Sequence, residues 1–224
     1  MAVAAFQVAG RVQASLLSDW EKRCLLWLAG RMPRWVNSDH LTLLGLAAML
    51  AAGLCYWWAR GNRSALFLVI FWLAVNWFGD SLDGTLARVR NQQRPRYGFY
   101  VDHIADAFGA LFLVGGLILS GYLSAWVAAA LLLAYFLLCI EVYLATYTLA
   151  TFRLTHAGLG PTELRILIAL GNVALFFQPT VPLFGARYRL FDVGGVVATA
   201  GLVLMFLAAV VRNTLALYRA ERLR

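Results

Sequence analysis

Apolar residues are gathered into six long segments along the chain. A helix that spans a bilayer needs roughly 20 predominantly apolar residues, and each segment comes close to this length. The expected spans cover approximately residues 39–59, 64–87, 99–120, 123–149, 162–179 and 191–213. The fifth segment is the weakest, because it opens with Glu163 and Arg165 and is ended by Pro179. The pattern predicts an all-α integral membrane protein with six transmembrane helices.

A different pattern precedes the first span. Six apolar residues fall on one face of a predicted helix: Leu16, Leu17, Trp20, Cys24, Trp27 and Leu28. Charged residues lie largely off this face: Asp19, Lys22 and Arg23. This pattern is typical of a helix that lies in the membrane interface, and packing against the bundle is the alternative. We therefore expect an N-terminal segment, residues 1–35, with an amphipathic juxtamembrane helix, and a six-helix transmembrane catalytic domain, residues 36–224.

The overall composition agrees with a membrane protein. Of the 224 residues, 62% are hydrophobic and 13% are charged, whereas a soluble domain is nearer half apolar and a quarter charged. The three cysteines, Cys24, Cys55 and Cys139, are far apart in apolar surroundings. We interpret them as small hydrophobic residues, without a disulfide framework or a zinc site.

Basic residues are distributed unevenly between the two sides of the predicted bundle. With six spans both termini share one side, and all but four of the 19 Lys and Arg residues lie there. The four on the other side are Arg60, Arg63, Arg187 and Arg189. The positive-inside rule therefore predicts that both termini are cytoplasmic. The net charge of +8 follows from this topology, and because it is spread over loops we do not expect binding to nucleic acid.

Four of the eleven acidic residues lie at the cytoplasmic ends of the second and third spans. Asp80 and Asp83 are three residues apart, and so occupy one face of their helix. Asp102 and Asp106, four residues apart, do the same on the next helix. Other polar residues reach a similar depth in the membrane: Asp39, Thr42, Glu141, Glu163 and Arg165. We expect all these groups to converge in one layer that faces the cytoplasm.

Four neighbouring carboxylates in a low dielectric repel one another and cannot all stay ionised without compensation. Protonation of some carboxylates is one way to relieve the repulsion, and binding of divalent cations is the other. Oxygen-only ligands favour Mg²⁺ or Mn²⁺ over zinc. Mg²⁺ often shares its coordination between carboxylates and substrate phosphates. Together with the arginines of the following loop, Arg88, Arg94 and Arg96, the acids indicate a diphosphate substrate held by metal. The alternative is that the acids only pair with these arginines, although acids in a bilayer are usually functional.

The motif Asp80-x-x-Asp83-Gly84-x-x-Ala87-Arg88, followed after nine residues by Gly98-x-x-x-Asp102-x-x-x-Asp106, resembles the signature of the CDP-alcohol phosphotransferases. The resemblance extends to the six spans and the interfacial helix. It implies an enzyme of phospholipid biosynthesis that transfers a substituted phosphate group from a CDP-alcohol to an acceptor alcohol and releases CMP. It also implies two divalent cations, Mg²⁺ or Mn²⁺, and a homodimer.

The same resemblance implies roles for individual residues. Metal ligands would be Asp80, Asp83, Asp102 and Asp106, and Asp106 would also be the catalytic base. Contacts with the CDP-alcohol are expected from Asp39, Thr42, Asp80, Asp83, Gly84, Ala87 and Arg88. Candidates for acceptor or phosphate contacts are Arg94, Arg96, Glu163 and Arg165. Pairing between Glu163 and Arg165 is the alternative for those two residues.

Two other functions use acids inside membranes. A proton- or metal-coupled transporter is one, but its acids would lie nearer the midplane, among discontinuous helices. A Mg-dependent prenyl-diphosphate transferase is the other, with different spacing between its aspartates. We favour the phosphotransferase, with a CDP-alcohol donor and an alcohol acceptor of which at least one is a lipid. Its expected location is a bacterial inner membrane, with the active site facing the cytoplasm.

Overall fold

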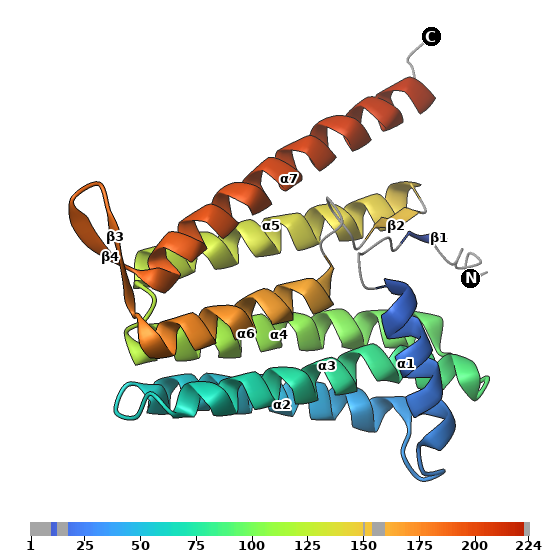
Figure 1. Cartoon of the computed structure of the whole chain (residues 1–224). Coiled ribbons are helices and arrows are strands. Elements are labelled where there is room, and N and C mark those ends of the chain that lie inside the picture. The colour runs from blue at the N-terminus through green and yellow to red at the C-terminus, as the bar shows by residue number, and fades with distance from the viewer. Residues whose placement is uncertain (1–9, 13–17, 150, 154–159, 222–224) are drawn as a thin grey trace.

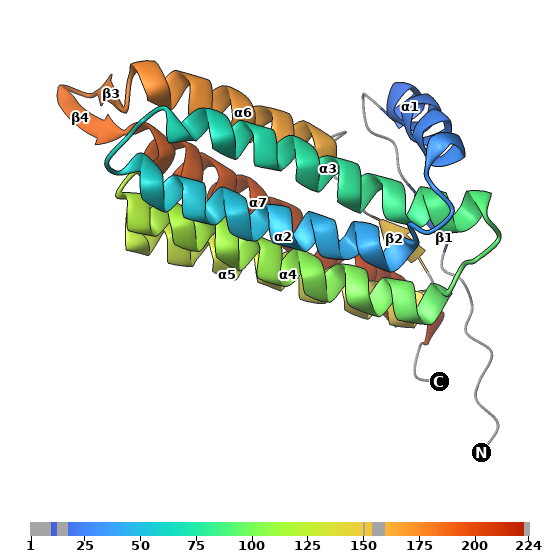
Figure 2. The same ribbon diagram turned by 90° about the horizontal axis from the view of Figure 1, so that it is seen from below.

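Seven α-helices form most of the part of the chain that a computed structural model describes, residues 10–12, 18–149, 151–153 and 160–221 (Figure 1). They are α1 (Ser18–Arg31), α2 (Ser38–Ala59), α3 (Ala65–Val89), α4 (Pro95–Ser120), α5 (Ala125–Leu149), α6 (Pro161–Phe177) and α7 (Leu190–Ala220). Successive helices from α2 to α7 run in alternating directions, and α1 crosses one end of the bundle (Figures 1 and 2).

Five of the described helices are long and apolar enough to cross a membrane, namely α2, α3, α4, α5 and α7. The expectation of an all-α integral membrane protein is therefore confirmed. Helix α6 corresponds to the fifth expected span, but it has 17 residues. At about 1.5 Å per residue it reaches only about 26 Å, less than the roughly 30 Å of a hydrocarbon core. The count of six spans, the side on which the termini lie and the domain limits at 35 and 36 stay predictions.

Two short sheets accompany the helices and were not expected from the sequence. Their strands are β1 (Gly10–Val12) parallel to β2 (Thr151–Arg153), and β3 (Thr180–Leu183) antiparallel to β4 (Ala186–Arg189). The turn between β3 and β4 places Phe184 at φ 50° and Gly185 at φ 81°. A two-residue hairpin turn with both φ values positive matches the twist of the strands. Phenylalanine rarely adopts this conformation, so the sequence carried little signal for the turn.

Close contacts at glycine hold the first three helices of the bundle together. Gly45 of α2 faces Gly79 of α3, where an added Cβ would lie 2.7 Å from the Gly45 nitrogen. Gly53 of α2 faces Gly116 of α4, where an added Cβ would lie 2.2 Å from the Gly53 carbonyl oxygen. Small residues allow such close approach of helix backbones in membranes. Helix α2 thus brings together α3 and α4, the two helices that carry the motif aspartates.

Helix α1 packs on the bundle with a face that only partly matches the predicted apolar face: Leu28 packs against the bundle and Cys24 is half-buried. Leu25 and Ala29 are buried in a cluster with residues of α2 and α3. Trp20 and Trp27 of the predicted apolar face are exposed instead, as suits tryptophan at a membrane interface. Leu16 and Leu17, which precede the helix and belong to the same predicted face, lie outside the described residues. The structure therefore combines packing on the bundle with an outward aromatic face.

The polar residues predicted for the site meet at one end of the bundle. The larger apolar cluster joins α2, α3, α4 and α6 towards the opposite end, and α5 packs chiefly against α7. Because the helices alternate in direction, the C-terminal half of α3 lies beside the N-terminal parts of α2 and α4, and the shorter α6 begins alongside α3, on the side of α1 (Figure 2). This is the end at which the motif aspartates of α3 and α4 lie.

Candidate active site

Three of the four motif aspartates meet between α3 and α4. One carboxylate oxygen from each of Asp80, Asp102 and Asp106 lies within 4.8 Å of the others. Asp102 and Asp106 are one turn apart on α4 and therefore share a face. Asp80 and Asp102 are half-buried, while Asp106 is exposed. We call these three residues the aspartate cluster.

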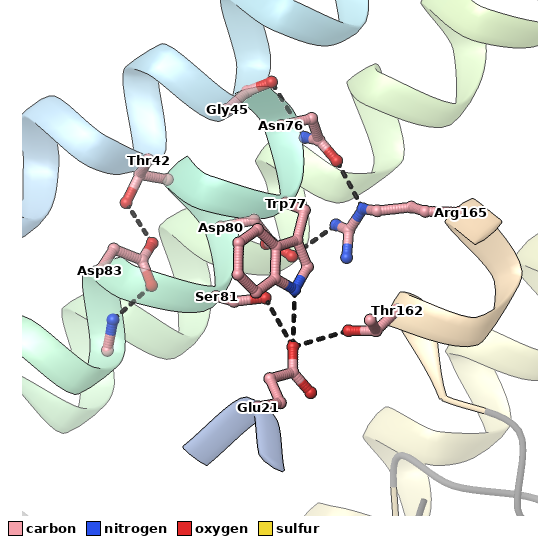
Figure 3. Close-up of polar contacts among 11 residues, drawn as sticks. Glu21, Thr42, Gly45, Asn76, Trp77, Asp80, Ser81, Asp83, Thr162 and Arg165 are labelled. Carbon is pink, nitrogen blue, oxygen red and sulfur yellow. Dashed lines mark hydrogen bonds and ion pairs between the residues drawn. The ribbon is translucent and has the colours of Figure 1, made fainter. Parts of the chain in front are cut away.

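Asp83 lies one turn beyond Asp80 on α3 and has contacts of its own. Its Oδ2 accepts a hydrogen bond of 2.6 Å from Oγ1 of Thr42, and its Oδ1 accepts one from the backbone nitrogen of Gly84 (Figure 3). Its backbone oxygen accepts a hydrogen bond of 3.1 Å from Oγ of Ser38. These contacts tie Asp83 to the start of α2. Thr42 and Asp83, both predicted to contact the CDP-alcohol, are thus direct neighbours.

An arginine of α6 reaches the aspartate cluster. Nη2 of Arg165 pairs with Oδ2 of Asp80 at 2.5 Å, and its Nε donates a 2.7 Å hydrogen bond to Oδ1 of Asn76 (Figure 3). Asn76 donates in turn to the carbonyl oxygen of Gly45 on α2, at 3.0 Å. Among the described residues, Nη1 of Arg165 is buried without a hydrogen-bond partner. The geometry therefore places Arg165 at the aspartate cluster. Of the two alternatives from the sequence, a place in the site or pairing with Glu163, this agrees with the first.

Glu163, the other residue of that pair of alternatives, lies at the start of α6. Its Oε2 accepts a 3.0 Å hydrogen bond from the backbone nitrogen of Gly160, the residue before the helix. Pro161 follows in the first turn, where proline is favoured because no intrahelical partner for its missing N–H is needed. Glu163 is itself buried and caps the N-terminal end of the helix that carries Arg165.

The remaining residues of the first half of the motif follow Asp83 to the end of α3. Gly84 and Ala87 are half-buried and Arg88 is exposed. Nη2 of Arg88 donates a 2.9 Å hydrogen bond to Oγ1 of Thr85. A Cβ added at Gly84 would lie 3.5 Å from Nη1 of Arg88, an ordinary van der Waals contact, so Arg88 lies along the helix beside Gly84.

Residues of the loop before α4 contact the start of α2. Arg94 forms an ion pair with Asp39, and both side chains are largely open to solvent. The hydrogen bond to Asp39 raises the pKa of the Arg94 guanidinium above its usual value. Arg96 is exposed in the first turn of α4. Asp39, predicted to contact the nucleotide, and Arg94, predicted to contact phosphate, are therefore direct neighbours at the start of α2.

Glu21 of α1 is a buried acid that the sequence analysis did not single out. Its Oε1 accepts hydrogen bonds from Nε1 of Trp77 and Oγ of Ser81 on α3, and from Oγ1 of Thr162 on α6 (Figure 3). The available signal was its spacing, because Glu21 is one turn before the buried Leu25 and shares its face. The apolar pattern pointed to the face that carries the tryptophans, and Glu21 lies on the buried face of the same helix.

Helix α5 covers another side of the site. The ring of His103 on α4 lies tilted against Phe99, with centroids 4.2 Å apart, and meets Tyr143 of α5 edge-to-face at 4.9 Å. His103 therefore packs between α4 and α5. Glu141 is buried, and its Oε1 accepts a 2.6 Å hydrogen bond from Nδ2 of Asn213. Glu141 therefore joins α5 to α7.

An open pocket of about 270 Å³ lies between α3 and α6, and Arg165 contributes to its lining. Most of its other lining residues are apolar, among them Leu73 and Ala74 of α3 and Ile166 and Ala169 of α6. Because both helices belong to the membrane bundle, the pocket offers an apolar approach to the cluster from the side.

Comparison with known protein families agrees with this arrangement. The family model named CDP-alcohol phosphatidyltransferase matches residues 35–212, which include every residue predicted for the site. The chain belongs to the CDP-alcohol phosphatidyltransferase family. As a member of this family it is a membrane-bound transferase of phospholipid biosynthesis that uses a CDP-alcohol donor and an alcohol acceptor. Its family membership confirms the resemblance of the aspartate motif and favours a transferase over the transporter and the prenyl transferase.

The aspartate cluster fits the divalent metals that CDP-alcohol phosphatidyltransferases use. Ligands lie about 2.0–2.1 Å from Mg²⁺, so ligands on opposite sides are about 4 Å apart. Oxygens that already lie within 4.8 Å of one another need only small side-chain rotations to reach this spacing. Arg165 also places a positive charge against Asp80, as expected where carboxylates repel one another. Oxygen-only donors are the kind that Mg²⁺ and Mn²⁺ prefer.

Proposed function

We propose that this protein transfers a substituted phosphate group from a CDP-alcohol to the hydroxyl group of an acceptor alcohol and releases CMP. The observation that carries the proposal is the aspartate cluster, in which one oxygen from each of three carboxylates lies within 4.8 Å of the others and Asp80 pairs with the half-buried Arg165. Concentrated negative charge of this kind is suited to binding a metal–diphosphate complex. At least one of the two substrates is a lipid, because the site lies at the end of a membrane bundle beside an apolar pocket.

We assign two divalent cations, Mg²⁺ or Mn²⁺, to Asp80, Asp83, Asp102 and Asp106. When bound, they would neutralise the diphosphate and the charge that develops on the departing CMP. The contact between Thr42 and Asp83 supports nucleotide binding at the start of α2. The proposed contacts of the CDP-alcohol there are Asp39, Thr42, Asp80, Asp83, Gly84, Ala87 and Arg88.

In the proposed reaction the acceptor oxygen attacks the phosphorus that carries the alcohol group of the donor. A new O–P bond forms, the bond from that phosphorus to the CMP oxygen breaks, and CMP leaves with the bonding electrons. Asp106 accepts the proton of the acceptor hydroxyl, because an alcohol is a weak nucleophile at neutral pH. The exposure of Asp106 relative to Asp80 and Asp102 supports this assignment, since an acceptor can reach it.

The surroundings suggest how the two substrates approach. The apolar pocket between α3 and α6 suits the hydrocarbon part of a lipid substrate. Among the described residues, Nη1 of Arg165 is without a hydrogen-bond partner and is available to donate to a phosphate or an acceptor oxygen. Arg94, Arg96 and Glu163 are further candidates for contacts with the acceptor or with phosphate. The charge distribution along the chain supports a site that faces the cytoplasm. A bacterial inner membrane and a homodimer complete the proposal, as the resemblance of the motif implies.

Release of CMP tests this function. Purified protein is supplied with Mg²⁺ and either CDP-diacylglycerol with polar alcohols or CDP-amino-alcohols with diacylglycerol, and CMP is quantified. Chelation with EDTA should abolish CMP release, and added Mg²⁺ or Mn²⁺ should restore it. Asp80→Asn should remove activity, whereas Asp192→Asn should not, because Asp192 accepts a hydrogen bond from the Ser124 nitrogen away from the cluster. Absence of CMP with every pair of substrates, or full activity in EDTA, would contradict the proposal.

A further inference from the structure

The buried carboxylate of Glu21 joins three helices next to the aspartate cluster. Its Oε1 accepts hydrogen bonds of 2.8 Å from Nε1 of Trp77, 3.3 Å from Oγ of Ser81 and 2.6 Å from Oγ1 of Thr162 (Figure 3). Helix α1 provides the acid, α3 provides two donors and α6 provides the third. Hydrogen bonds to an ionised acceptor are stronger than those between neutral groups. The three contacts therefore form one polar connection that joins α1, α3 and α6.

The donors to Glu21 are close neighbours of the charged residues in the site. Ser81 follows Asp80 directly on α3, and Thr162 lies one turn before Arg165 on α6. Helices α3 and α6 are thus linked twice at the same end of the bundle. One link is the ion pair of Arg165 with Asp80, and the other passes through Glu21. The second link fixes the first turn of α6, and the position of that turn decides how far Arg165 extends.

We propose that Glu21 is a positioning residue, which keeps the start of α6 docked on α3 so that Arg165 stays at Asp80. The inference rests on the proposed function, because its effect on catalysis passes through Arg165 and the aspartate cluster. Without Glu21, the Thr162 hydroxyl and the Trp77 N–H lose their shared acceptor, and buried donors without a partner are unfavourable. The first turn of α6 then shifts or loosens, and Arg165 is no longer held in one place.

The first experiment compares Glu21→Ala with Glu21→Gln in the CMP-release assay. Glutamine keeps an oxygen that can accept from Trp77 and Thr162, whereas alanine removes it. We expect Glu21→Ala to lower kcat/KM by about tenfold to 10²-fold, since a displacement of about 1 Å near a reacting centre can cost 10²-fold. Glu21→Gln should stay within about threefold of wild type. The matched control is Glu141→Ala, which removes another buried acid with an interhelical partner, Asn213, and should leave kcat/KM nearly unchanged.

A double-mutant cycle separates positioning from a general loss of fold. If Glu21 acts through Arg165, then Glu21→Ala should lower kcat/KM by less than about twofold when Arg165→Gln is already present. If Glu21 only anchored α1, Glu21→Ala would lower kcat/KM by the same factor with and without Arg165→Gln. Thr162→Val, which removes one donor at similar volume, should reproduce part of the effect of Glu21→Ala in the wild-type background and none in the Arg165→Gln background.

Hydrogen exchange gives a measurement that does not depend on activity. Backbone amides in the first turns of α6 should exchange faster in Glu21→Ala than in wild type, while Glu21→Gln and Glu141→Ala should match wild type in that segment. Unchanged exchange there, or equal losses of kcat/KM with and without Arg165→Gln, would overturn the role of Glu21. A wild-type protein that releases no CMP would instead refute the proposed function, and the exchange measurement would still decide whether Glu21 holds α6.

Discussion

Replacing Gly116 by alanine should force α4 away from α2 and destabilise the bundle. The added Cβ would lie 2.2 Å from the carbonyl oxygen of Gly53, 2.5 Å from its Cα and 2.6 Å from its carbonyl carbon. These are backbone atoms and cannot rotate away, so the helices must separate by about 1 Å to restore ordinary contact. Overpacking typically costs about 1–3 kcal/mol, and a backbone obstacle places the change near the upper end. The better helix propensity of alanine offsets about 1 kcal/mol, which leaves a net loss of about 2 kcal/mol.

Thermal unfolding in detergent measures this loss, with Gly115→Ala as the matched control. Gly115 is the preceding residue on the same helix, and a Cβ added there meets nothing within 4 Å. The control should therefore melt at or slightly above the wild-type temperature. At about 2–4 °C per kcal/mol for a chain of this size, Gly116→Ala should melt about 4–8 °C lower. A Gly116→Ala protein that melts at or above Gly115→Ala would refute the reasoning from helix contact.

Three further predictions concern the site and its orientation. Asp106→Asn should lower turnover by about 10²–10⁴-fold while the binding isotherm for the CDP-alcohol changes much less; turnover within about tenfold of wild type would contradict the base assignment. Thr42→Val should lower kcat/KM by about tenfold or more, because Asp83 loses a hydrogen bond, and Thr42→Ser should restore it; equal kinetics of the two variants would exclude this contact from the site. A cysteine at position 94 should be labelled only from the cytoplasm and one at position 124 only from outside, and the opposite pattern would reverse the topology.

The sequence by itself determined which segments are helical and which residues are candidates for the chemistry. The length of an apolar run depends on local composition and on bilayer thickness, so α2 to α5 begin and end within about four residues of the predicted limits. The shared face of Asp102 and Asp106 likewise follows from helix periodicity alone, whatever surrounds the helix. The weak signal of the fifth segment agrees with a helix of 17 residues, and the β-hairpin at Phe184 left no recognisable pattern.

Only the tertiary structure decided which helix faces meet. A helix in a membrane is apolar on nearly every side, so its periodicity does not show which side packs against protein. The close approaches of α2 to α3 and α4 at glycine set the rotation of these helices. That rotation places Asp80 with the aspartates of α4 and turns Asp83 towards Thr42. The hydrogen bond between Glu21 and Thr162 joins residues 141 positions apart, and no local pattern in the sequence specifies such a contact, because it forms only when three separate helices have docked.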